Sequence, residues 1–222
     1  MFIAVDGIDG AGKTTLVKQL AHHLAHLNPL TTKEPTSTTS WGQRLRQSAF
    51  EGRLSREKEI EFFHLDRLHH LENKIKPALV SCRVVICDRY VDSTLAFQTG
   101  TPAQADQLFA YFAKDILVPD VTFILKCHVS VGMERIIRER GKLSKFEDLP
   151  TLEKARSIYE SRSGDNYEYV DASGSVEDTL QQTLDALIRR FPYLENGLIR
   201  SGGDVKFSDC GDDSNLKIAA GG

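Results

Sequence analysis

The sequence predicts an α/β fold in which a central parallel β-sheet of about five strands is flanked by helices on both faces. Two observations predict it. Short apolar runs alternate along the chain with longer segments of helical periodicity. The first apolar run, residues 2–5, leads through a glycine-rich turn into leucines at helical spacing, which gives a strand, a loop and a helix in that order. The length of 222 residues suits one such domain.

Turn and periodicity signals place the elements of the first half of the chain. The helix after the glycine-rich turn is ended by Asn28-Pro29. A weak strand signal at 30–33 is followed by a polar loop. We expect helices over 41–51 and 55–80, and a strand in the continuous apolar run at 84–87.

The second half continues the same alternation as far as about residue 190. The elements expected there are a helix over 103–116, a strand over 121–125, helices over 130–140 and 151–163, a strand over 167–170 and a helix over 175–190. The composition changes after this, because six of the 16 glycines fall in the last 26 residues. We therefore expect a single domain over 1–195 and a flexible, polar, glycine-rich tail over 196–222.

Residues 7–14 form the pattern G-x-x-x-x-G-K-T, a P-loop placed between a strand and a helix. The glycines allow backbone N–H groups to turn toward phosphate oxygens. Lys13 is then able to reach the β- and γ-phosphates, and the Thr14 hydroxyl is a typical Mg²⁺ ligand. The motif predicts binding of a nucleoside triphosphate together with Mg²⁺. The residues expected to hold it are Gly7, Asp9, Gly10, Ala11, Gly12, Lys13, Thr14 and Thr15.

Asp88 and Arg89 follow the apolar strand at 84–87. An aspartate at the end of a strand beside a P-loop commonly pairs with the metal-binding threonine in NTPases. In a parallel sheet both groups lie at the carboxyl edge, where ligands bind. We therefore expect Asp88 and Thr14 to hold the metal, and Arg89 to lie between the donor and acceptor phosphates. An ordinary ion pair at a strand end is the alternative interpretation.

Charge and hydropathy exclude several classes of function. A formal net charge of −3 leaves no basic excess, so broad binding to nucleic acid is not expected. The first residues run directly into a strand, and no apolar stretch approaches the roughly 18 residues that a membrane helix needs. We expect a soluble, cytoplasmic protein with no signal peptide and no membrane partner.

Several further segments resemble the thymidylate kinase family, P-loop kinases that convert dTMP and ATP to dTDP and ADP. The matches run in order over about 1–190, and the block at 88–98 is the one specific to this family. The matching segments are the P-loop at 9–15, Lys33-Glu34-Pro35 against the family's Arg-Glu-Pro, F-H-L-D-R at 63–67, D-R-Y-V-D-S-T-L-A-F-Q at 88–98, Pro119-Asp120, and K-F-E at 145–147.

The resemblance implies how a pyrimidine nucleotide would be bound. Phe63 would stack on the pyrimidine ring, and Arg67 would donate to a base carbonyl. Arg89 would grip the 5′-phosphate, Phe97 would crowd the 2′ position, and Asp9 would accept a hydrogen bond from the 3′-hydroxyl. As alternatives, Phe63 can be a core side chain and Asp9 can cap the glycine loop. The implied acceptor site comprises Asp9, Glu34, Pro35, Arg46, Phe63, Arg67, Arg89, Phe97 and, lining the base pocket, Ser93, Thr94 and Gln98.

Phosphoryl transfer needs in-line positioning and positive charge over the phosphate oxygens. The family divides into members with an arginine in the P-loop and members with basic residues in a lid. This chain has Gly10-Ala11 in the loop and several cations in a segment at about 138–150, so it resembles the second kind, with a lid there. The resemblance implies a homodimer and a catalytic set of Lys13, Arg89, Asp9, Arg140 and Lys145.

Departures from the family pattern leave the acceptor open. Thr36-Ser37 replace a glycine pair, Lys126 replaces an aspartate and Phe97 replaces a tyrosine. One alternative is therefore a related kinase acting on a modified pyrimidine such as a 5-hydroxymethyluracil deoxynucleotide, either free or within DNA, which would make DNA a partner. A GTPase-type switch is a third possibility, although the sequence lacks an Asn-Lys-x-Asp motif for reading guanine.

Overall fold

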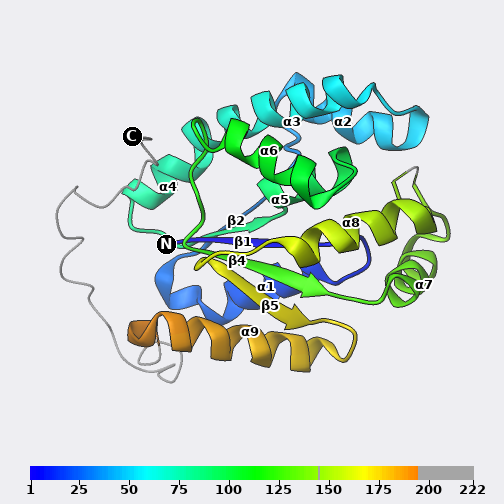
Figure 1. Ribbon diagram of the computed structural model, residues 1–222. Helices are drawn as coiled ribbons and strands as arrows, with labels where there is room; N and C mark the ends of the chain where they lie inside the picture. The colour runs from blue at the N-terminus through cyan, green and yellow to red at the C-terminus, as the bar shows by residue number, and fades with distance from the viewer. Residues whose placement is uncertain (145, 195–222) are drawn as a thin grey trace.

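The computed structural model describes residues 1–144 and 146–194, which form a sheet with helices on both sides (Figure 1). The sheet has five strands in the order β2-β3-β1-β4-β5, and every neighbouring pair is parallel. This confirms the predicted fold class. The strands are β1 (Phe2–Gly7), β2 (Leu30–Lys33), β3 (Val85–Asp88), β4 (Val121–Lys126) and β5 (Tyr167–Asp171).

Helices cover both faces of the sheet. Figure 1 shows α1 and α9 on one face, α3, α5 and α8 on the other, and α7 beyond the carboxyl ends of the strands. The helices are α1 (Lys13–His23), α2 (Ser40–Glu51), α3 (Arg56–His70), α4 (Lys76–Val80), α5 (Val91–Gln98), α6 (Pro102–Phe112), α7 (Val129–Arg140), α8 (Leu149–Ser161) and α9 (Val176–Arg190). Short 3₁₀ turns lie at Ala25–Leu27 and Pro192–Leu194.

Three details differ from the sequence-based expectation. Helix α5 was not predicted, because all eight of its residues are buried and an all-round buried helix has no amphipathic pattern. The helix expected over 55–80 is three segments, since a π-helical turn at Leu71–Ile75 separates α3 from α4. The helix expected to reach residue 116 ends at Phe112, and turns follow it.

The register of the sheet brings the ends of three strands to one edge. All six residues of β1 are buried, as expected for the central strand of a sheet covered on both faces. Val5 of β1 lies opposite Asp88 of β3, and Lys33 of β2 also lies opposite Asp88. The P-loop leaves β1 at this same edge, so it begins beside Asp88 and Lys33. This is the edge at which parallel sheets bind ligands.

No helix among the described residues is long and apolar enough to cross a membrane. Three parts of the sequence-based prediction lie outside the described residues. They are the tail over 196–222, residue 195 at the end of the predicted domain, and the predicted catalytic residue Lys145.

Candidate active site

The glycine loop packs directly against α7. Gly10 has a φ of +78°, in the left-handed region, and a Cβ added there would lie 2.1 Å from the carbonyl oxygen of Gly132. A side chain at position 10 is therefore excluded both by its own backbone conformation and by the neighbouring helix. This contact explains in physical terms why the loop carries glycine at position 10.

Lys13 is the buried cation of the loop. Its side-chain ammonium donates hydrogen bonds to the carbonyl oxygens of Gly7, at 2.9 Å, and Ile8, at 2.6 Å. The residue is only 5% exposed. Burial lowers the pKa of Lys13 to about 8, and the nearby Arg89 guanidinium acts in the same direction. Lys13 is therefore expected to lose its proton at a lower pH than an exposed lysine does.

Thr14, Asp88 and Lys33 meet at the carboxyl ends of β2 and β3. The Thr14 hydroxyl donates to Asp88 Oδ2, and Lys33 Nζ donates to the same oxygen at 2.9 Å. Although burial opposes ionisation, the cations Lys33 and Lys13 hold the pKa of Asp88 below its usual value. Asp88 Oδ1 is buried and has no hydrogen-bond partner among the described residues. A hydroxyl and a carboxylate with a free oxygen fit the ligand preference of Mg²⁺.

Arg89 follows β3 in an unusual backbone conformation. Its φ of +73° is rare for a residue with a side chain, and strain of this kind is typical of functional positions. The guanidinium pairs with the Asp9 carboxylate and donates to the Ser93 hydroxyl at 3.3 Å. It also lies 5.8 Å from the centre of the Phe97 ring. Although burial opposes ionisation of Asp9, Arg89 and Lys13 hold its pKa below the usual value.

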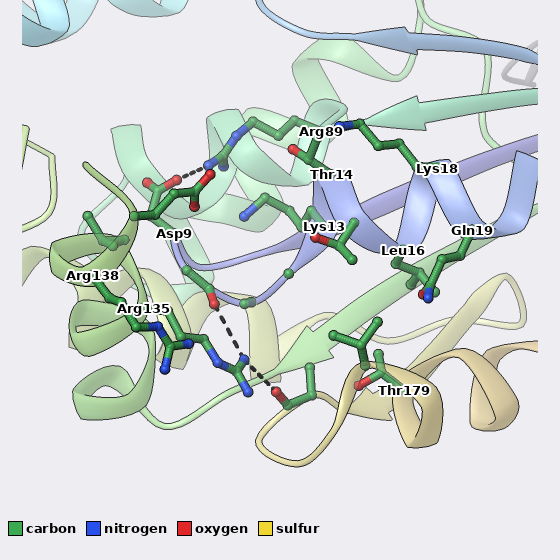
Figure 2. A pocket seen from close by; sticks show the side chains of 18 of the residues that line it. Asp9, Lys13, Thr14, Leu16, Lys18, Gln19, Arg89, Arg135, Arg138 and Thr179 are labelled. Carbon is green, nitrogen blue, oxygen red and sulfur yellow. Dashed lines mark hydrogen bonds and ion pairs between the residues drawn. The ribbon is translucent and has the colours of Figure 1, made fainter.

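Asp9, Lys13, Thr14, Lys33 and Arg89 line one cavity of about 740 Å³. Figure 2 shows Lys13, Asp9 and Arg89 gathered over the glycine loop, with Arg135 and Arg138 extending from α7. The start of α9, including Thr179, closes another side. The predicted residues that line the cavity are Asp9, Gly10, Ala11, Gly12, Lys13, Thr14, Thr15, Arg89 and Arg140, while Gly7 contributes its carbonyl to Lys13.

Helix α7 supplies three arginines to this cavity, of which Arg138 and Arg140 belong to the predicted lid. Arg140 pairs with the buried carboxylate of Glu147. Arg135 was not predicted, and it donates to the carbonyl oxygens of Ala172, at 2.8 Å, and Gly174, at 3.0 Å. It thus ties α7 to the segment that precedes α9.

A second cluster lies around Arg67 on α3, outside the cavity described above. The Arg67 side chain is fully buried; its Nε donates to Glu34 Oε2 at 2.9 Å, and its Nη2 donates to the Thr94 hydroxyl at 2.9 Å. Arg67 Nη1 is buried and has no partner among the described residues. The two N–H groups of Nη1 are therefore without a hydrogen-bond acceptor among the described residues.

The other predicted acceptor residues have definite surroundings. Gln98 donates from its amide to the buried Glu59 carboxylate at 3.0 Å. Arg46 donates to the main-chain carbonyls of Pro35 and Thr36, the first of which follows a cis peptide bond. Phe63 is partly buried, and among the described residues no ring or cation packs on it, whereas Lys58 lies 4.9 Å from the ring centre of its neighbour Phe62. Arg89 lines the cavity and also contacts two of the predicted acceptor residues, Ser93 and Phe97.

Near Arg89 lies the buried carboxyl of Asp6, which was not predicted as a site residue. Asp6, on β1, accepts hydrogen bonds from the Tyr90 backbone N–H at 3.1 Å and from the Ser93 hydroxyl at 2.5 Å. The Ser93 oxygen also lies 3.0 Å from the Tyr159 hydroxyl of α8. Burial raises the pKa of Asp6 to about 7, and the nearby Asp92 carboxylate adds to the effect.

This raised pKa of Asp6 predicts a dependence of stability on pH. Between the usual aspartate value and about 7, the native state holds a proton that the unfolded chain has lost. The free energy of unfolding should therefore fall as pH rises through this window, with a contribution of at most about 1.4 kcal/mol per pH unit from one group. Urea unfolding between pH 5 and pH 8 measures it, and Asp6→Asn should remove this part of the slope. An unchanged slope in Asp6→Asn, equal to that of the exposed control Asp165→Asn, would contradict it.

Comparisons with known proteins point to one family over most of the length of the chain. The family model of thymidylate kinase matches residues 5–183. A thymidylate kinase of Xanthomonas euvesicatoria pv. vesicatoria is 40% identical over 187 residues, which cover 82% of this chain and 80% of that protein. A thymidylate kinase of Xanthomonas campestris pv. campestris is 39% identical over 186 residues, with 82% and 80% covered. One from Xylella fastidiosa is 37% identical over 188 residues, with 83% and 88% covered.

Proposed function

The chain belongs to the thymidylate kinase family, and from that membership we propose that it transfers the γ-phosphoryl group of ATP to dTMP, giving dTDP and ADP. The observation that carries the proposal is the position of Arg89. Its guanidinium pairs with Asp9 in the phosphate cavity and contacts Ser93 and Phe97 on the other side. One cation thus lies between the predicted donor site and the predicted acceptor site, where the transferred group must pass.

We assign the donor site to the cavity over the P-loop. The buried Lys13 supplies positive charge to the triphosphate, and α1 directs its N-terminus at the same anion. Thr14 and Asp88 would hold Mg²⁺, which supplies charge neutralisation at the phosphate oxygens when it is bound. The part of the cavity near Arg135 and Thr179 leaves room for the nucleoside of ATP.

We assign the acceptor base to the cluster around Arg67. The unpartnered Nη1 of this buried guanidinium is a donor suited to a base carbonyl, and thymine carries two carbonyls. Phe63 has no ring or cation packed on it among the described residues and is available for stacking on the base. Asp9, already ionised beside Arg89, is an acceptor suited to the 3′-hydroxyl.

Positive charge on the open side of the cavity comes from α7. We propose that the segment at about 138–150 is a lid of the single domain at 1–195, with Arg138 and Arg140 acting on the phosphates. In the described residues Arg140 is held by Glu147, so this pair would have to loosen or reorient for direct contact with a phosphate. Because the substrates are soluble nucleotides, we place the reaction in the cytoplasm.

We also propose that the chain forms a homodimer through the helices beside α3. Val80 at the end of α4 is 75% exposed, and Tyr111 on α6 is 64% exposed. Aromatic side chains such as Tyr111 are enriched at protein interfaces. Light scattering after size-exclusion chromatography measures the mass directly, and Tyr111→Glu should shift a dimer toward the monomer.

An ADP-release assay with different acceptors tests the proposed function. Turnover is expected with dTMP in the presence of ATP and Mg²⁺. The relatives named above are thymidylate kinases, which favours dTMP over a modified pyrimidine. The assay should include dUMP, hydroxymethyl-dUMP and a duplex containing the modified base. Absence of turnover with dTMP, together with turnover of a modified acceptor, would overturn the assignment.

Replacing Arg67 with alanine should weaken dTMP binding and blur the choice of base. Loss of a hydrogen bond from a charged donor corresponds to a rise of about 10–100-fold in the KM for dTMP. The KM for ATP should stay nearly unchanged, because Arg67 lies outside the cavity over the P-loop. Arg67→Lys, which keeps a positive charge opposite Glu34, separates loss of the donor geometry from loss of charge. An equal loss toward every acceptor would indicate that Arg67 is only structural.

A further inference from the structure

A chain of buried polar side chains runs behind Arg67, away from the expected base. Glu34 Oε2 accepts from Arg67 Nε at 2.9 Å, while Glu34 Oε1 lies 3.1 Å from His70 Nδ1. His70 Nε2 lies 2.7 Å from the Thr32 hydroxyl of β2. Arg67 and His70 are three residues apart on α3, so they reach the same carboxylate from one face of the helix. All four side chains are buried.

The chemistry of these contacts fixes the direction of the hydrogen bond between His70 and Glu34. A carboxylate only accepts, so His70 Nδ1 carries a proton and donates to Glu34. His70 Nε2 pairs with the Thr32 hydroxyl, which is able either to donate to the ring nitrogen or to accept from it. Each member is thereby satisfied, and each orients the next. The Glu34 carboxylate is held at both oxygens, which leaves Arg67 little freedom to rotate.

A metal site is the competing interpretation of the same region. Glu34, His70 and Cys87 offer ligand atoms that all lie within 4.8 Å of one another. Cysteine binds a metal as a thiolate, however, and burial raises the pKa of the Cys87 thiol well above its usual value. The thiol also lies 3.0 Å from the Arg89 carbonyl oxygen, to which it donates. With both Glu34 oxygens already engaged, this set is better suited to hydrogen bonding than to a metal.

We propose that His70 is a positioning residue for the acceptor base, acting through Glu34 on Arg67. Thr32 holds the ring of His70, His70 holds Glu34, and Glu34 aims the guanidinium so that Nη1 faces the base. This inference rests on the proposed function, because it assumes that Arg67 reads a carbonyl of the acceptor. It assigns part of the base selectivity to residues that do not touch the nucleotide.

The hydrogen-bonded chain of Thr32, His70, Glu34 and Arg67 is called the relay below. Two amide substitutions at His70 test it. His70→Asn places its amide near the position of Nδ1 and keeps a donor for Glu34, whereas His70→Gln places it near Nε2 and loses that donor. The Gln variant should raise the KM for dTMP by about tenfold, with kcat and the KM for ATP within about twofold of the original protein. The Asn variant should stay close to the original. A purely structural role for His70 would affect both variants alike.

Selectivity gives a second readout. In 5-methyl-dCMP an amino group replaces the C4 carbonyl of thymine. The preference for dTMP over this analogue should shrink in His70→Gln, because a misplaced Arg67 loses more toward the base that it matches. Thr32→Val should have a smaller effect of the same sign. Thr122→Val is the matched control, since Thr122 is a buried strand residue whose hydroxyl has no partner among the described residues.

Three outcomes are decisive. A KM for dTMP unchanged in folded His70→Gln, or raised equally in Asn and Gln, overturns the relay. Failure of the original protein to use dTMP overturns the proposed function instead. In that event the relay is still tested by hydrogen exchange at Arg67 Nε–H, followed by NMR without nucleotide. Exchange should be faster in His70→Gln than in His70→Asn, and equal rates would overturn the relay.

Discussion

Replacing Lys13 with alanine is expected to lower kcat for dTMP phosphorylation by a factor of about 10²–10³, the usual cost of removing one preorganised donor to a developing negative charge. Lys13 is the buried cation at the base of the cavity, and its ammonium lies against the loop that would hold the triphosphate. The fold should survive, because the substitution removes a partner of two carbonyls that water entering from the cavity is able to satisfy. Steady-state kinetics with saturating ATP and dTMP measure the loss.

The pH dependence of ATP use gives an independent test of Lys13. Burial lowers its pKa to about 8 in the free protein, so above this value Lys13 becomes neutral and binds phosphate less well. The ratio kcat/KM for ATP should therefore fall as pH rises above about 8, since this ratio reports ionisation of the free enzyme. Lys74→Ala, at an exposed position on the π-helical turn, is a control expected to show the original rate and pH profile. A Lys13→Ala variant with the same high-pH decline would contradict the assignment.

The parts of the site that are contiguous in sequence could be predicted. The P-loop works through the backbone of a short segment, so its residues are recognisable without any knowledge of the fold. The placement of Asp88 and Arg89 followed from the rule that parallel strands end at a common edge, and the register of Val5 against Asp88 agrees with it. The positions of these residues at the edge of the sheet could be predicted because one strand or one loop decides them; their roles in the reaction stay predictions.

Contacts between distant segments could not be predicted in the same way. Lys33 reaches Asp88 only because β2 and β3 pair in a particular register. His70 meets Glu34 only because α3 crosses the end of β2, and a lone histidine carries no signal of such a contact. The family resemblance implied a base-reading role for Arg67, but it did not indicate what holds Arg67 in place. The partners of a buried charge depend on tertiary packing.

Arg89→Ala is expected to cause the larger loss, about 10³–10⁵ in kcat, which is the range measured for arginines that stabilise phosphoryl transfer. The physical reason is that its guanidinium lies between the two proposed substrate sites. The negatively charged phosphoryl group passes from donor to acceptor there, and the guanidinium stabilises its charge. Arg89→Lys keeps the charge without the planar fork and should recover only a small part of the rate. Single-turnover kinetics separate this loss of chemistry from a change in dTMP affinity.

Stability measurements separate the catalytic role of Arg89 from its structural one. Removing the guanidinium leaves the Asp9 carboxylate without its ion-pair partner, so Arg89→Ala should also destabilise the fold, and Asp9→Asn should restore part of that stability. The backbone at position 89 adds a second effect. At a φ of +73°, glycine avoids a cost of about 1–2 kcal/mol that alanine bears.

Arg89→Gly should therefore be more stable than Arg89→Ala while being equally inactive. Urea unfolding of the two variants measures the difference, and their kcat values provide the comparison. Three variants are compared: Arg89→Ala, Arg89→Gly and the double variant of Arg89→Ala with Asp9→Asn. If kcat rose with the free energy of unfolding across the three, the rate loss would reflect a damaged fold. A low kcat in all three, whatever their stability, would locate the effect in the missing guanidinium. The strained backbone would then be the structural cost of holding that group between the two phosphates.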